Sequence, residues 1–449
     1  MLEAQIASWV NNFKPLPLLN PKIDKCIECG FCEVNCLTCG FTLSSRQRIV
    51  VQREVARLKA LEKEGKPAGD VRKRLCLLQK QYRYPGNRTC AGDGLCAMSC
   101  PMEINTGDLT HTIRRTKHPQ GSIGYAVGKR VAKHFSTVKG LLRAALTSAN
   151  AIHTVVGSKI MCFLANAMHR FLYLPLWTPA MPKSLRLSSL RRLCPKKSGN
   201  KSGLLRSNRN DDDRKVVYFP SCINQTMGLD KASPEKLPLI SEMIALFQKA
   251  GYEAIFPENM NSLCCGTIWD SKGMTDIADR KSAELEAALY KASENGKYPV
   301  LCDQSPCLYR MRHAIQKMKL YEPVEFISTF LLDRLEFVQT GMPVAIHITC
   351  STRKMGLDTQ MIKLAESCST KVLLPEEVGC CGFAGDKGFT HPEVNAYALR
   401  KLRPQIEKAG ITKGYSNSRT CEIGLTTNSG ISYQSIVYLV NQHTKNKKY

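Results

Sequence analysis

The sequence predicts a mixed fold in three parts: an α-helical domain with two cysteine motifs, a basic helical segment, and two pseudo-symmetric α/β lobes that each contain Cys-Cys-Gly. Three observations lead to this prediction. A C-x2-C-x2-C-x3-C motif lies near the N-terminus, a stretch of 100 residues has no acidic side chain, and the second half of the chain repeats itself. With 449 residues, 43% of them apolar, the chain is long enough for two to three globular domains.

The expected domain boundaries follow these features. The predicted segments are a helical domain with the cysteine motifs (1–110), a basic helical segment (111–182), a linker rich in Pro, Ser, Gly and basic residues (183–214), a first Cys-Cys-Gly lobe (215–340) and a second (341–449).

The chain has 21 cysteines, an odd number at irregular spacing, which argues against a disulfide framework and favours metal ligands. We therefore expect a reducing, cytoplasmic compartment. The N-terminus shows no basic region followed by an apolar run, so no signal peptide is expected. The most apolar stretch considered, 160–177, is interrupted by Asn166, His169, Arg170 and Pro175, and on that basis no membrane span is expected.

The first cysteine motif comprises Cys26, Cys29, Cys32 and Cys36. This is the spacing of two-cluster ferredoxins, in which three thiolates on a short loop hold one iron–sulfur cluster and the fourth reaches another. Zinc would instead favour paired C-x2-C knuckles. The spacing therefore predicts iron–sulfur ligands.

The second motif contains Cys90, Cys96 and Cys100-Pro101, with Asp93 at the position where a further cysteine would sit. In the two-cluster arrangement, one cluster is held by Cys26, Cys29, Cys32 and Cys100, and the other by Cys90, Cys96 and Cys36. The fourth ligand of the second cluster is Asp93, Cys39 or absent. We expect two [4Fe-4S] clusters, or one [4Fe-4S] and one [3Fe-4S] if that ligand is absent.

Two helices are expected between the motifs. Ser44 or Ser45 can cap the first, whose apolar face is formed by Val51, Val55, Leu58 and Leu61; the second covers Val71 to Gln79. Cluster loops separated by helices resemble the helical two-cluster ferredoxin of succinate dehydrogenase iron–sulfur subunits.

The net charge of +26 is concentrated in one region. Residues 111–210 contain 19 Lys and Arg but no Asp or Glu, and helices are expected over 127–146 and 152–173. Basic amphipathic helices with Tyr173 and Trp177 near one end suit an anionic membrane surface. Equally, the segment could pack on the protein's own core or on an acidic partner. Nucleic acid is not expected as a partner, because no nucleic-acid-binding motif accompanies the charge.

The C-terminal half is an internal repeat. Each copy is expected to contain, in order, a buried strand ending in cysteine, a helix, a second strand, Cys-Cys-Gly, a charged helix and a closing cysteine. The first copy has these elements at 216–222, 239–250, 253–256, 264–266, 276–293 and 307; the second has them at 344–350, 359–366, 371–374, 380–382, 392–408 and 421. Strand–helix–strand order predicts two α/β lobes.

Each lobe is expected to bring thiolates from three places to one centre. Adjacent cysteines cannot face one centre from a regular strand, so Cys-Cys-Gly implies a turn that glycine permits. Buried cysteines without a cofactor are the alternative. The candidate cofactor ligands are Cys222, Cys264, Cys265 and Cys307 in the first lobe and Cys350, Cys380, Cys381 and Cys421 in the second. Cys302 could join the first set but has no counterpart.

The paired Cys-Cys-Gly lobes resemble the cysteine-rich domain of heterodisulfide reductases. A two-cluster ferredoxin segment followed by two such lobes resembles the iron–sulfur subunit of glycolate oxidase and of respiratory lactate oxidation systems. The segment from Cys26 to Arg48 is most similar to fused FAD/iron–sulfur D-lactate dehydrogenases. One departure is that Gln304 and Ser418 stand three residues before Cys307 and Cys421, where the family often has another cysteine.

This resemblance implies an electron-transfer subunit. A flavin on a partner protein would oxidise D-lactate or glycolate, and the clusters of this chain would pass the electrons to a membrane quinone or cytochrome at the inner face of the cytoplasmic membrane. No FAD-binding motif was identified in this chain, so FAD is expected on the partner and no catalytic residue here. The lobes could also hold a further cluster. The alternative is a disulfide reductase subunit similar to heterodisulfide reductase.

Overall fold

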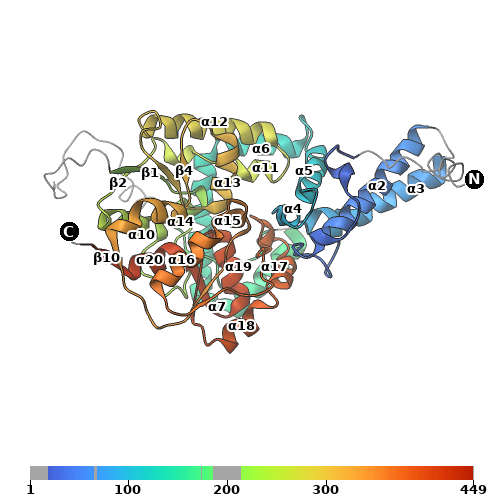
Figure 1. Ribbon diagram of the computed structural model, residues 1–449. Helices are drawn as coiled ribbons and strands as arrows, with labels where there is room; N and C mark the ends of the chain where they lie inside the picture. Colours follow the sequence, from blue (N-terminus) through green and yellow to red (C-terminus); the bar gives the residue numbers. More distant parts are fainter. Residues whose placement is uncertain (1–18, 65–67, 173, 186–213, 448–449) are drawn as a thin grey trace, which may run out of the picture. The chain divides into compact units, whose positions relative to one another are not determined.

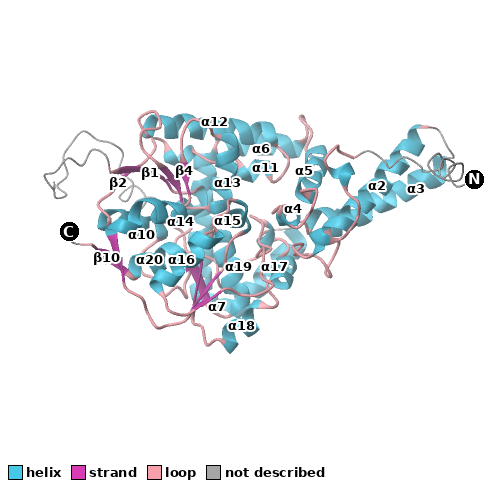
Figure 2. Cartoon of the chain, viewed as in Figure 1, coloured by secondary structure: helices cyan, strands magenta, loops and turns pink. Residues whose placement is uncertain are grey.

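The computed structural model describes residues 19–64, 68–172, 174–185 and 214–447 (Figure 1). The chain divides into two compact units, residues 1–113 and 114–449. Most of the expected linker, 183–214, lies outside the described residues. The structure is mixed α/β, as the sequence predicts, and its short strands are outnumbered by helices (Figure 2).

The N-terminal unit is helical. Its elements are η1 (Ile23–Lys25), η2 (Phe31–Glu33), α2 (Ser45–Lys63), α3 (Ala68–Tyr82), the π-helix η3 (Arg83–Arg88), α4 (Leu95–Met98) and the start of α5 (Thr106–Lys117). Ser44 caps α2 in a capping box with Gln47, which confirms the predicted helix start. Leu75, Val71 and Leu78 of α3 pack against Val55 and Leu58 of α2. The two expected helices are therefore present.

The second unit begins with the basic segment, which forms α6 (Ile123–Lys133) and α7 (Phe135–Leu172). The expected break between residues 146 and 152 is wrong. The chain breaks instead at His134, between α6 and α7, and at Gly157, whose φ of 74° and ψ of 173° interrupt α7. A positive φ of this size suits glycine because it has no Cβ.

The two halves of α7 have different surroundings. Before the kink, Phe135, Lys139, Arg143 and Leu146 are buried at helical spacing against the lobes. After it, Phe163 and Phe171 are 73% and 78% exposed.

By length and composition, residues Phe135–Phe171 could cross a membrane. An 18-residue window within this helix has a mean hydropathy of 1.3, and only 6% of the window is buried. The expectation of no such segment is therefore wrong, because it rested on residues 160–177 and did not include the apolar residues before Gly157.

Each lobe contains a parallel four-stranded sheet. The first sheet has the order β2-β1-β3-β4 and the second β7-β6-β8-β9, so equivalent strands occupy equivalent places. This confirms the internal repeat. The strands are β1 (Lys215–Phe219), β2 (Glu253–Ile255), β3 (Val300–Cys302), β4 (Leu320–Tyr321), β6 (Val344–Ile346), β7 (Val372–Leu373), β8 (Lys413–Ser416) and β9 (Ser432–Ser435).

The helices also recur. The first lobe has α9 (Cys222–Thr226), α10 (Leu239–Lys249), η4 (Met260–Ser262), α11 (Thr267–Asp270), α12 (Thr275–Ala292), α13 (Ser305–Ala314), α14 (Pro323–Phe326), the π-helix η5 (Ile327–Leu331) and η6 (Leu332–Arg334). The second has α15 (Cys350–Lys354), α16 (Asp358–Cys368), η7 (Lys387–Phe389), α17 (Pro392–Ala398), α18 (Leu402–Lys408), α19 (Arg419–Ser429) and α20 (Ile436–Gln442).

Two local expectations differ from the structure. The predicted helix 392–408 is split into α17 and α18, because Pro404 lacks an N–H and its ring would clash with the carbonyl of Arg400 in a continuous helix. The first cysteine of each lobe begins a helix rather than ending a strand. Ser221 and Thr349 cap these helices, α9 and α15.

The two lobes share one hydrophobic core. It includes Phe247 of α10, Phe326 of α14, Leu364 of α16 and Tyr438 of α20. The antiparallel strands β5 (Leu335–Phe337) and β10 (Thr444–Asn446) pair the end of the first lobe with the end of the second. This packing fixes the two cysteine groups within a single unit.

Candidate iron–sulfur sites

The first candidate site lies in the N-terminal unit. Burial raises the pKa of Cys32 to about 12, and the nearby sulfurs of Cys96, Cys26, Cys100 and Cys36 add to the shift. Cys32, Cys26 and Cys100 belong to the set expected for one cluster, and the structure brings them together. Cys29, the fourth member of that set, is exposed.

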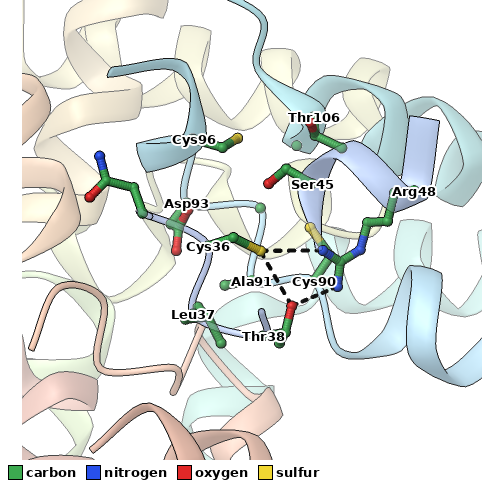
Figure 3. Close-up of a pocket in the computed structure, with 14 residues that line it drawn as sticks. Cys36, Leu37, Thr38, Ser45, Arg48, Cys90, Ala91, Asp93, Cys96 and Thr106 are labelled. Atoms are coloured by element: carbon green, nitrogen blue, oxygen red, sulfur yellow. Dashed lines mark hydrogen bonds between the residues drawn. The ribbon is translucent and has the colours of Figure 1, made fainter. Parts of the chain in front are cut away.

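The second expected ligand set lines a single pocket (Figure 3). Cys36, Cys90, Cys96 and Asp93 all contribute to its wall, although they come from two motifs more than fifty residues apart. Asp93 Oδ1 accepts a hydrogen bond from the backbone N–H of Leu95 at 3.1 Å. The donor set of three thiols and a carboxyl suits iron.

Cys39 is not among the residues that line this pocket. Its pKa is raised by burial and then by the carboxylate of Glu33 and the sulfur of Cys36. Of the two candidates for the fourth ligand, Asp93 therefore has the better position.

Arg48 is a component of this pocket that the sequence reasoning missed. Its side chain is buried, and Nη1 lies 3.6 Å from the sulfur of Cys36. Nε donates to the carbonyl of Gly86 at 2.8 Å and Nη2 to Thr38 Oγ1 at 2.9 Å. The guanidinium group thus places a fixed positive charge beside Cys36 and Cys90.

In the first lobe, five cysteine sulfurs form one group, in which Cys264, Cys265 and Cys302 are buried and Cys222 and Cys307 are half-buried. The thiol of Cys264 lowers the pKa of both Cys222 and Cys265 by hydrogen bonding, and Cys307 also hydrogen-bonds to Cys265. Cys265 Sγ lies 3.1 Å from Thr267 Oγ1.

Cys302, at the end of β3, is completely buried beside them, and burial together with Asp303, Cys265 and Cys222 raises its pKa. The sequence could not place Cys302 in this group with certainty of position, because the repeat gives it no counterpart in the second lobe.

The Cys-Cys-Gly turn has the geometry that its glycine predicts. Gly266 has φ 90°, and a Cβ at this position would lie 2.4 Å from the carbonyl oxygen of Ala278. Gly382 in the second lobe has φ 74°. Side chains larger than glycine are strained in this conformation and would collide with the neighbouring helix in the first lobe. The turn therefore allows both cysteines of each pair to face inward.

In the second lobe, Cys381 Sγ lies 3.1 Å from Cys421 Sγ. The backbone N–H of Gly382 donates to Cys380 Sγ at 3.4 Å. Cys350 begins α15 at the place equivalent to Cys222.

Behind this group, His347 Nε2 donates to the carbonyl of Gly379 at 3.0 Å, and burial lowers the pKa of His347 to about 4. The imidazole is therefore neutral near pH 7.

Among the described residues, no three Cys, His, Asp or Glu side chains are placed to hold a single metal ion. The thiolates of an iron–sulfur cluster lie farther apart than the ligands of a single metal ion, because each thiolate binds a different iron. The convergence of cysteines from three places in the first lobe matches such a donor set. When bound, a cluster of this kind accepts and releases single electrons.

A comparison with protein families matches the model described as CCG, cysteine-rich domain, to residues 216–312 and 344–426. Each lobe contains one of the two matched segments. The matched segments contain all eight of the expected lobe cysteines as well as Cys302. The match supports the Cys-Cys-Gly iron–sulfur family and an electron-transfer role. No curated protein matched the chain.

Proposed function

We propose that this chain is the iron–sulfur subunit of a flavin-dependent dehydrogenase of D-2-hydroxy acids, D-lactate or glycolate. FAD on a partner protein takes a hydride from the substrate, and this chain carries the electrons singly to a membrane quinone or cytochrome. The observation that carries the proposal is the combination of a two-motif ferredoxin-like unit with two CCG lobes in one chain. The chain itself is expected to have no dehydrogenase activity.

The expected cofactors are two clusters in the N-terminal unit and a further centre in the lobes. Support for the first two comes from the grouping of Cys26, Cys32 and Cys100, and from the pocket shared by Cys36, Cys90, Cys96 and Asp93. Support for the third comes from the group of five cysteine sulfurs in the first lobe.

The experiment uses full-length chain purified without oxygen, reconstituted with iron and sulfide, and mixed with a D-lactate-oxidising flavoprotein. D-lactate or glycolate should bleach the cluster absorbance only when the flavoprotein is present. C36S should slow the transfer of electrons to a quinone analogue, whereas C76S should not, because Cys76 is exposed on α3 and outside both motifs. Substrate oxidation by the chain alone would contradict the proposal.

A disulfide reductase is less favoured as the alternative. Each lobe lacks one thiolate that such a centre often uses, since Gln304 and Ser418 occupy those positions, and both are buried. Turnover of a disulfide substrate with ferredoxin-level electrons would revive it.

We also propose that the protein is cytoplasmic and binds the inner face of the membrane through the second half of α7. This part of the helix exposes Ile160, Phe163, Leu164, Met168 and Phe171. It lies within the region that has 19 basic and no acidic residues, so the apolar face is accompanied by a charge that attracts anionic lipid.

A further inference from the structure

The first half of α7 carries a lysine into the first lobe. Lys139 is only 3% exposed, and its Nζ donates to Gln225 Oε1 at 2.7 Å. Gln225 lies in α9, three residues after Cys222, and its Nε2 donates to the carbonyl of Pro220 at 2.7 Å. The ammonium group is thus held beside the helix that begins at the first cysteine of the lobe.

The charge of Lys139 has no acidic partner. None of the described Asp or Glu side chains forms an ion pair with it. Cys222 and Cys264 lie near it, and in their thiolate form they would oppose its charge. Its Nζ also lies 5.5 Å from the centre of the Phe135 ring. A buried charge is costly unless it is paired, so this site requires an anion.

Two neighbouring cations have other partners. Lys281 is also buried, but it is paired with Glu284 and donates to the carbonyl of Ser262 at 3.1 Å. Arg143 donates to the carbonyl of Gln225 at 3.1 Å and to Asn261 Oδ1 at 3.1 Å. Of these three cations, Lys139 is the one that is hydrogen-bonded to a side chain of the helix that begins at Cys222.

We propose that Lys139 is the counter-charge of an anionic metal–thiolate centre held by the cysteines of the first lobe, and that it raises the reduction potential of this centre. The inference rests on the proposed function, because it requires a centre in the lobe. It assigns the basic segment a second role: before Gly157 it completes an electron-transfer site, and after Gly157 it presents an apolar face.

The physical basis is the change in charge on reduction. Adding one electron to the centre adds one negative charge and breaks no bond. A fixed positive charge in a poorly solvated site stabilises the reduced form more than the oxidised form. Removing that charge while keeping the side-chain volume should therefore make the centre harder to reduce.

The test is a redox titration of the full chain, purified without oxygen and reconstituted with iron and sulfide, and followed by electron paramagnetic resonance. C222S first identifies the signal of the first lobe as the one that it removes or alters. At a fixed potential, K139M should then lower the ratio of reduced to oxidised centre about tenfold, which corresponds to about 59 mV for one electron. K139Q, which can still hydrogen-bond to Gln225, should act in the same direction if K139M does not fold.

Two controls separate charge from packing. K139R keeps the charge and should keep the ratio within about twofold of the wild type. K281M removes a buried lysine whose charge is already balanced by Glu284. This variant should lower stability, but it should change the ratio of reduced to oxidised centre much less than K139M does.

The outcomes distinguish the two proposals. If C222S alters no signal and iron content is unchanged, the lobe holds no centre, and both the lobe centre of the proposed function and this inference fail. If C222S removes a signal but K139M and K139Q leave its potential unchanged, only the role of Lys139 is overturned. An equal shift in K281M and K139M would also overturn it, because it would indicate a packing effect.

Discussion

The side-chain amide of Gln304 donates a hydrogen bond from Nε2 to the hydroxyl oxygen of Ser418 at 2.8 Å, across the boundary between the two lobes. Gln304 Oε1 in turn accepts from the backbone N–H of Arg419 at 3.0 Å. The two residues occupy equivalent positions, three before the closing cysteine of each lobe. Positions where related lobes often carry thiolates thus hold a polar contact that joins the lobes.

This contact predicts a measurable loss of stability in Q304A. The substitution removes the hydrogen bonds that Gln304 makes with the buried Ser418 hydroxyl and Arg419 N–H, which should lower the free energy of unfolding by about 1–3 kcal/mol. Urea denaturation of wild type and variant measures this difference. Q316A is the control, since Gln316 is exposed and its loss should change stability by no more than about 0.5 kcal/mol. Equal effects in the two variants would contradict the structural role of Gln304.

The pocket of Cys36, Cys90 and Cys96 predicts that Asp93 is the fourth ligand of the second cluster. A carboxylate is a harder ligand than a thiolate, so the iron it holds should be lost more readily. D93C should retain that iron on exposure to a chelator, and D93A should give the magnetic resonance signal of a three-iron cluster. C39S should behave like the wild type, because Cys39 is not among the pocket residues. Loss of one iron in C39S but not in D93A would reverse the assignment.

The exposed face of α7 predicts binding to anionic membranes. The full chain should sediment with vesicles that contain phosphatidylserine and not with pure phosphatidylcholine vesicles, and binding should weaken as salt is added. The double variant F163E/F171E should reduce binding at least about a hundredfold, because each phenylalanine side chain contributes roughly 1.5–3 kcal/mol when buried.

V338E/M342E provides the matched control for this experiment. Val338 and Met342 are 44% and 54% exposed on the lobes, outside the basic segment. If this variant loses binding to the same extent as F163E/F171E, or if the wild type stays in solution with anionic vesicles at low salt, α7 is not the membrane-binding element.

The buried imidazole of His347 predicts a pH dependence of stability. Its folded pKa of about 4 lies below the unfolded value near 6.5, so the unfolded state binds more protons between these values. The contribution of the neutral His347 imidazole to the free energy of unfolding is therefore present above about pH 6.5 and is lost as the pH falls toward 4. Between pH 6.5 and 5 the wild type should lose about 1.6 kcal/mol more than H347Q.

Urea unfolding of the two proteins at both pH values gives this difference. H313Q serves as the comparison, since His313 is exposed at the end of α13, and it should show the same pH dependence as the wild type. The role of His347 would be refuted if H347Q lost as much stability on acidification as the wild type.

Much of the fold could be predicted from local patterns. The helix after Ser44, the two α/β lobes and the turn at Gly266 follow from capping, hydrophobic period and the conformational freedom of glycine, which depend on neighbours close in the chain. The breaks at His134 and Gly157 were not predicted, because the apolar pattern continues across them.

The sequence by itself determined which residues can bind metal and how they are grouped, because cysteine spacing and an internal repeat are written along the chain. Only the tertiary structure decided what surrounds them. The contacts of Arg48 with Cys36, of Lys139 with Gln225 and of Gln304 with Ser418 join residues from different elements. The charge and packing around a buried sulfur depend on which distant segments the fold brings to it, and no local pattern records those contacts.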